Sequence, residues 1–193
     1  MRKIFLGCVM VVLVLVVLVE MVIAQNIRYQ NDEYGISMDI PEGAIVEGRD
    51  EWVEFSTAMA GMTAEKAYED LEKRGVVVFV SFLGVSNFEV ANLLISVSMV
   101  PLPKGLVVKE DVFGYAKNIY QGDLLDKEMD DEIVIGGLNG WETATDAGDL
   151  FPFESRDILL VDQQHGRLIY LSCVASLENR AIAKGIIESF QVN

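Results

Sequence analysis

The sequence predicts an α+β domain, in which a largely antiparallel β-sheet is covered by helices and follows an N-terminal hydrophobic leader helix. Short runs of alternating apolar and polar residues, bounded by turn residues, are typical of strands joined by turns. Three longer segments carry apolar residues at helical spacing. Strands joined mainly by turns pair antiparallel, and the helices between them must cover the sheet. No repeat or Pro/Gly linker interrupts residues 25–193, which we expect to form one domain.

The leader, residues 1–24, directs the rest of the chain out of the cytoplasm. Arg2 and Lys3 precede a long uncharged apolar run, and these charges hold the N-terminus inside while the run enters the membrane. Val22-Ile23-Ala24 has the small-residue ending of a signal peptide, and cleavage there yields a chain that begins at Gln25. Residues 4–24 as a helix would measure roughly 31 Å, which also matches a bilayer core of about 30 Å. We therefore expect an extracytoplasmic protein, either secreted or anchored to the outer face of the cytoplasmic membrane by residues 4–24.

The first half of the domain contains both element types. Ile36, Met38 and Ile40 alternate with polar residues and predict a half-buried strand, with Ser37 on its exposed face. Thr63 can cap a helix that runs through Lys73. The other strands predicted in this half are Glu51–Phe55, the largely apolar Val76–Leu83 and the alternating Leu93–Met99.

The second half continues with a helix, three strand candidates and a closing helix. Asp111 can cap a helix whose apolar stripe ends at Ile119. Asn139-Gly140 is a strong turn signal between two short strands. The remaining predicted elements are the hairpin Ile133–Ile135 with Trp141–Thr145, the strands Glu154–Val161 and Arg167–Val174, and an amphipathic helix over Leu177–Phe190.

The composition excludes several classes of function. The formal net charge is −15, and such an acidic surface repels phosphate backbones, so we expect no nucleic-acid partner and no membrane contact beyond the leader. Phosphate-loop, nucleophile-elbow, His-Glu-x-x-His and Cys-x-x-Cys motifs are all missing from the sequence. The domain's one cysteine, Cys173, lies in an apolar run and is expected to be buried, and its one histidine, His165, lies in a predicted hairpin turn.

An acidic loop over residues 123–132 is the cluster with possible ligand chemistry, because calcium prefers carboxylate oxygens. Its candidate metal ligands are Asp126, Glu128, Asp130, Asp131 and Glu132. An EF-hand count from Asp126 places Asp131 where glycine is required and Gly137 where the bidentate glutamate is required. A solvated loop therefore explains the cluster better than a calcium site, and we expect no cofactor.

Two rings in Phe151-Pro152-Phe153 are candidates for a partner surface, because a rigid proline separates them at the start of a loop. Aromatic residues near the start of a strand usually pack inward, which favours the core for Phe151 and Phe153.

Several segments, taken in order, resemble one family. Tyr29 with Asn31–Gly43 resembles the opening hairpin of PsbP-like and DcrB-like domains, in which a Tyr-Gly-aromatic-Ser strand runs into Pro-x-Gly. Gly137–Glu142 is similar to the family's Gly-x-x-Gly-aromatic-Glu turn and strand. Gly166–Leu171 resembles its late strand, and Ile186–Phe190 its last helix. The resemblance implies a sheet sandwiched by helices and a non-catalytic accessory or binding role, with no catalytic residues.

The sequence thus predicts an exported binding or accessory module that is not an enzyme and whose partner is a protein or a small ligand. The alternative is a metal-assisted hydrolase that uses the acidic loop 123–132.

Overall fold

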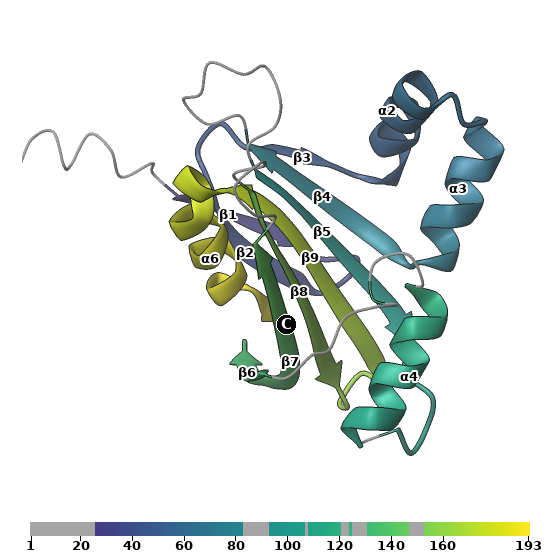
Figure 1. The fold of residues 1–193 in the computed structure, drawn as a ribbon, viewed down its shortest axis with the longest axis vertical. Coiled ribbons are helices and arrows are strands. Elements are labelled where there is room, and N and C mark those ends of the chain that lie inside the picture. The colour runs from purple at the N-terminus through teal and green to yellow at the C-terminus, as the bar shows by residue number, and fades with distance from the viewer. Residues whose placement is uncertain (1–25, 83–92, 107, 121–123, 125–130, 147–152) are drawn as a thin grey trace, which may run out of the picture.

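The centre of the fold is a seven-stranded sheet with the strand order β3-β4-β5-β9-β8-β7-β6, in which every pairing is antiparallel (Figure 1). This computed structural model describes residues 26–82, 93–106, 108–120, 124, 131–146 and 153–193. The strands of the large sheet are β3 (Ile45–Glu47), β4 (Val76–Phe82), β5 (Leu93–Pro101), β6 (Asp131–Ile135), β7 (Leu138–Asp146), β8 (Phe153–Asp162) and β9 (Arg167–Ser176).

A second, three-stranded sheet joins the two ends of the described chain. Its central strand, β2 (Ile36–Pro41), pairs with β1 (Asn26–Asn31) on one side and with β10 (Gln191–Val192) on the other, both antiparallel. The described helices are α2 (Arg49–Ala60), α3 (Ala64–Lys73), α4 (Lys109–Ile119) and α6 (Arg180–Ser189), the last preceded by the 3-10 turn Leu177–Asn179.

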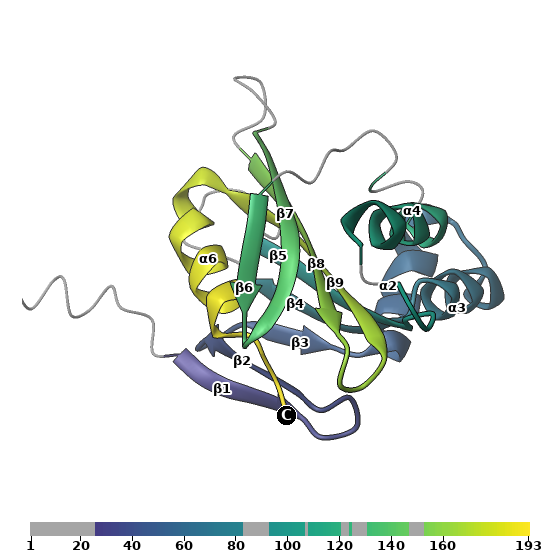
Figure 2. The same ribbon diagram turned by 90° about the horizontal axis from the view of Figure 1, so that it is seen from below.

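Helices lie on both faces of the large sheet, with α6 on one side and α2, α3 and α4 on the other (Figure 2). Successive side chains of β5 point alternately to the two faces of the sheet, so they show which residues belong to each face. Ile95 and Val97 belong to a buried cluster that also contains Ile36 of β2 and Ile186 of α6, and we call this side the α6 face. The opposite side is the α4 face.

Two separate apolar clusters cover the α4 face. In the first, Val112 and Ala116 of α4 pack with Tyr170 of β9. In the second, Val53 of α2 and Leu71 of α3 pack with Phe79 of β4. The helices therefore cover this face in two patches, and each patch has its own buried core.

The fold class predicted from the sequence is confirmed, as are most of its elements. Ile36, Met38 and Ile40 are buried in β2, and the buried β4 and alternating β5 begin at the expected residues. Thr63 caps α3 by accepting the Lys66 N–H through Oγ1 at 3.4 Å.

The strand predicted over Glu51–Phe55 is wrong, because these residues lie in α2. Glu51 accepts the Gly48 N–H through Oε2 at 3.1 Å, which satisfies a donor at the start of the helix. Asp50 and Glu51 also place negative charge in the first turn, where the helix dipole favours it. Gly61, with φ 61°, then ends the helix in the left-handed conformation.

The exposed face predicted for Ser37 is also wrong, because Ser37 is only 3% exposed. Arg28 of β1 reaches across the small sheet and donates from Nη2 to Ser37 Oγ at 2.8 Å. The strand β2 is therefore covered on both faces.

The start of α4 and the position of the β6–β7 turn differ from those predicted from the sequence. Asp111 lies in the first turn of α4, and Val108 stands at the cap position. The β6–β7 turn is Gly136-Gly137, since Ile135 pairs with Leu138, so Asn139-Gly140 lies inside β7.

None of the helices in the described part of the chain is long and apolar enough to span a membrane. The leader, residues 1–24, lies outside the described residues, so its role as signal peptide or anchor stays a prediction.

Candidate functional site

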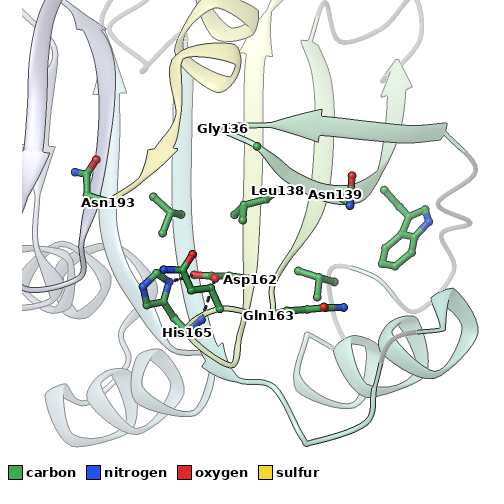
Figure 3. A pocket seen from close by; sticks show the side chains of 12 residues that line it. Gly136, Leu138, Asn139, Asp162, Gln163, His165 and Asn193 are labelled. Atoms are coloured by element: carbon green, nitrogen blue, oxygen red, sulfur yellow. Dashed lines mark hydrogen bonds and ion pairs between the residues drawn. The ribbon is translucent and has the colours of Figure 1, made fainter.

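A hollow of about 510 Å³ opens at one end of the large sheet (Figure 3). It lies between the β6–β7 turn, the β8–β9 turn and the end of β10, and we call it the sheet-end hollow. Asn139 of β7, Gln163 and His165 of the β8–β9 turn, and Asn193 after β10 line it (Figure 3).

Glycines shape the β6–β7 turn beside the hollow. Gly136 and Gly137 have φ values of 57° and 81°, the left-handed pair that a two-residue hairpin turn requires. A Cβ on Gly136 would lie 2.6 Å from the Phe190 carbonyl oxygen at the end of α6. The turn can therefore pack directly against the C-terminal end of α6, which places Leu138 and Asn139 over the hollow.

Four carboxamide side chains supply most of the hydrogen-bonding capacity of the hollow. Asn139, Gln163, Gln164 and Asn193 line it, and their side chains make no hydrogen bond to any residue that the structure describes. Each carboxamide offers two donor hydrogens and an acceptor oxygen. Four apolar side chains complete the described walls, namely Leu138, Trp141, Val161 and Val192.

A hydrogen-bonded carboxylate forms the base of the hollow. Asp162, at 1% exposure, accepts the His165 backbone N–H at 3.1 Å through Oδ1. Its Oδ2 lies 2.8 Å from His165 Nδ1 and accepts Arg167 Nε at 2.7 Å. Burial opposes the charge of Asp162, but the hydrogen bonds from Arg167 and His165 outweigh it and lower the pKa of this carboxyl group.

Arg167 extends this network to the small sheet. Its Nη1 donates to the Tyr34 carbonyl oxygen at 2.7 Å, in the β1–β2 turn. The β8–β9 turn is thereby fixed to another part of the fold, and its two glutamines are held at the rim of the hollow on a rigid support.

A His–Asp pair is two-thirds of a catalytic triad, but the hollow offers no third member. Among its described lining residues there is no serine, threonine or cysteine. Cys173 is buried in the core of the α6 face, and burial raises the pKa of its thiol to about 12. The described residues therefore support binding chemistry at this site better than acyl transfer.

Sequence reasoning placed His165 correctly in a hairpin turn but missed its partner. The signal was local: an aspartate three residues before the histidine, at a turn where an Asp side chain commonly accepts a backbone N–H further along the chain. The amide cluster could not be found in this way, because Asn139 and the two glutamines come from different hairpins.

The predicted acidic-loop ligands lie elsewhere or outside the described residues. Asp126, Glu128 and Asp130 are not described. Asp131 and Glu132 are exposed at the start of β6, at the end away from the Gly136-Gly137 turn. Across the described ranges, no group of three His, Cys, Asp or Glu side chains is arranged to hold a metal ion.

The predicted aromatic surface is described only in part. Phe151 lies outside the described residues. Phe153 is half-buried at the start of β8, opposite Ser176 of β9. Neither residue lines the sheet-end hollow.

The structure is an α+β domain with a polar hollow at one end of its large sheet. No protein-family model matches the chain, and no curated protein matches it in sequence. The cyanobacterial PsbP of Synechocystis superposes with a TM-score of 0.52 at 16% identity, over 89% of this chain and 94% of that one. The PsbP-like fold that the sequence motifs predicted is therefore confirmed.

Two other solved structures match less well in shape. The Ran-binding protein Mog1p of Saccharomyces cerevisiae gives a TM-score of 0.48 at 12% identity, with 88% of this chain and 96% of that one covered. LpqN of Mycobacterium tuberculosis, described as involved in cell envelope biogenesis, gives 0.48 at 10% identity, with 88% and 91% covered. Since a shared fold hosts many functions, the function has to be argued from the site itself.

Proposed function

We propose that this chain is an exported, non-catalytic binding module that holds a segment of a protein partner at the end of its large sheet. The observation that carries the proposal is the cluster of four carboxamides, whose side chains make no hydrogen bond within the described chain. Carboxamides both donate and accept, as the peptide backbone does, so they can pair with the N–H and C=O groups of an extended segment.

The charge of the hollow favours an uncharged polar ligand. No lysine or arginine is among its described lining residues, and the charge of the one acidic side chain among them, Asp162, is already balanced by Arg167. A phosphate or nucleic acid would find few cations here and an acidic protein around it.

The size of the surface favours a protein segment over a compact ligand. A second hollow of about 490 Å³ lies on the other side of the β8–β9 turn, lined by Tyr34, Arg49 and Met99 among others. His165 lines both hollows, so they form one continuous surface around the turn. A surface of this length matches an extended chain that interacts along several residues.

Export by the leader is the second part of the proposal. It is supported by the charged start and apolar run of residues 1–24, and cleavage is expected to leave Gln25 as the first residue. N-terminal sequencing of the protein isolated from cells tests it. A sequence that begins at Gln25 indicates secretion, and one that begins at Met1 indicates a tethered protein.

The binding role is tested by removing two amides from the hollow. Gln163→Ala with Gln164→Ala alters two exposed turn side chains that hold nothing in the described fold, so the melting temperature should stay unchanged. Partners captured from native membranes by the wild-type chain should be lost from this variant. Titration of the purified partner should show an affinity reduced by about tenfold, from hydrogen bonds worth about 0.5–1.5 kcal/mol each.

Asn118→Ala is the matched control, because it removes an exposed amide on α4 away from the hollow. It should bind the partner as the wild type does. Equal affinity of the double variant and the wild type would show that the hollow is not the binding surface.

A further inference from the structure

A third cavity, of about 230 Å³, lies on the α4 face between the α2–α3 helix pair and the sheet. We call it the Trp52 pocket. Trp52 comes from α2, Leu71 from α3 and Phe79 from β4, while β5 and β9 supply the floor. It shares no lining residue with the sheet-end hollow, so it is a separate site.

The walls of the Trp52 pocket are apolar and partly aromatic. The rings of Trp52 and Phe79 are stacked, with centroids 4.0 Å apart and planes 18° apart. Leu71 also lines the pocket and is itself buried in the same apolar cluster. Such walls favour the flat faces of an aromatic ligand, through contact area and ring stacking.

The floor of the pocket carries two hydroxyl groups side by side. Ser96 of β5 and Ser172 of β9 are directly opposite in register. Leu94 and Val174, the next opposed pair on this face, flank them. Side chains opposed in this way have Cβ atoms about 4.5–5.5 Å apart, so one polar atom of a ligand can reach both hydroxyls.

These hydroxyls retain their hydrogen-bonding capacity. Within the described residues, neither Ser96 nor Ser172 makes a side-chain hydrogen bond. Each hydroxyl can donate one hydrogen and accept others, so together they match a ligand group that both donates and accepts. A ligand hydroxyl has this property.

The rim of the pocket excludes a charged ligand. Asp70 of α3 and Arg74, the residue that caps the end of this helix, form an ion pair at 3.7 Å, so their charges largely cancel. No other charged residue is among the described residues that line the pocket. An anion or a cation would therefore lose its hydration at the floor without gaining a counter-charge there.

We infer that the Trp52 pocket binds an uncharged single-ring aromatic molecule that carries one hydroxyl group. The volume agrees with this class, because an apolar cavity of about 150 Å³ is enough to hold benzene. The ring lies against Trp52 and Leu71, and its hydroxyl reaches Ser96 and Ser172.

Nuclear magnetic resonance of the isolated protein tests the inference, with p-cresol as the probe. The chain has two tryptophans, Trp52 and Trp141, and Trp141 lines the sheet-end hollow instead. Addition of p-cresol should shift the indole signal of Trp52 and the amide signals of Ser96 and Ser172, and leave the Trp141 indole in place. A Trp141→Phe variant assigns the two indole signals. Shifts at Trp141 alone, or none at millimolar p-cresol, would overturn the site.

Related probes and variants test the chemistry of the ligand. Toluene lacks the hydroxyl and should bind roughly three- to tenfold more weakly than p-cresol, the loss expected for one hydrogen bond. Ser96→Ala with Ser172→Ala should lower p-cresol affinity to that of toluene and leave toluene binding unchanged. Ser81→Ala, on the same face but outside the pocket, is the matched control. Equal binding of p-cresol by the double variant and the wild type would overturn the role of the hydroxyls, and tight binding of p-toluate would overturn the requirement for an uncharged ligand.

Discussion

On the α6 face of the large sheet, neighbouring strands present aliphatic side chains to one another, whereas a polar row crosses the same strands on the α4 face. Val97, Leu171 and Ile158 are direct neighbours in register on the α6 face, and all are buried. On the α4 face the corresponding row is Ser96, Ser172, Asp157 and Thr143.

This difference assigns distinct roles to the two faces. The α6 face is a continuous core, and its burial supplies much of the stability of the fold. The α4 face contains polar groups that are costly to bury unless they are hydrogen-bonded, and the helices cover it in two patches. Two residues of the polar row, Ser96 and Ser172, line the Trp52 pocket, where the continuous aliphatic packing of the α6 face is not repeated.

The largest effect that the comparison of the two faces predicts is on the thiol reactivity of Cys173, a core residue of the α6 face. With a pKa of about 12 against an ordinary value of 9.0, its thiolate fraction should be about a thousandfold lower than that of a free thiol. A Cys8→Ser variant removes the other cysteine, so that thiol labelling reports Cys173 alone. Labelling should be negligible in the native protein and rapid in denaturant. Rapid native labelling would mean that the α6 face is not closed.

Shortening a β5 side chain on the α6 face should lower the free energy of unfolding far more than shortening one on the α4 face. Ile95→Ala removes a side chain that is 2% exposed and should lower the free energy of unfolding by about 2–5 kcal/mol. Ser96→Ala, at the next residue, should change it by less than about 0.5 kcal/mol. Urea unfolding measures both, and similar costs for the two variants would contradict the division into faces.

The polar row should still contribute to the stability of the fold at positions where its side chains are hydrogen-bonded. Tyr170 donates through its hydroxyl to Asp157 Oδ1 at 2.5 Å, and both residues are buried. Tyr170→Phe should therefore cost about 1–3 kcal/mol in urea unfolding, because Asp157 keeps its burial and loses this donor. Tyr115→Phe removes an exposed hydrogen bond to the Pro101 carbonyl oxygen and should cost less.

Asp162 is a second buried carboxylate of β8, and its contribution to the free energy of unfolding should change only at acid pH. Its pKa lies below the ordinary value of 3.8, so the stability it supplies is fully present above that pH and is lost as the pH falls through the folded-state pKa. Asp162→Asn should make the fall in unfolding free energy below about pH 4 shallower. Asp39→Asn is the control, because that carboxylate is an exposed partner of Arg28. An unchanged acid profile in Asp162→Asn would contradict the network.

The core and most elements could be predicted from the sequence because their signals are local. Alternation fixes which residues of β2 and β5 are buried, and Thr63 marks the start of α3. The β6–β7 turn could not be chosen locally, because Gly136-Gly137 and Asn139-Gly140 both suit a turn. The choice depends on a tertiary contact: a Cβ on Gly140 would lie 2.0 Å from the Leu159 carbonyl oxygen, so this glycine is needed inside the sheet.

Neither candidate site could be predicted from the sequence, because each combines residues from segments that are distant in the chain. The sheet-end hollow combines Asn139 with residues of the β8–β9 turn and of β10, and only the register of the sheets brings these together. The Trp52 pocket requires α2, part of which, Glu51–Phe55, was predicted as a strand. Only the Asp162–His165 pair had a local signature, three residues apart in one turn.

The small sheet sets the order in which the domain can be completed. β2 pairs with β10, and Asp39 N–H donates to Ser189 Oγ at 2.7 Å across 150 residues of sequence. Contacts between such distant segments carry a large loop-closure cost and slow folding. The hairpin of β1 and β2 precedes the rest of the domain in the sequence. The buried side of β2 can be covered only after α6 and β10 have formed. The small sheet is therefore complete only when the segment at the end of the described chain has folded.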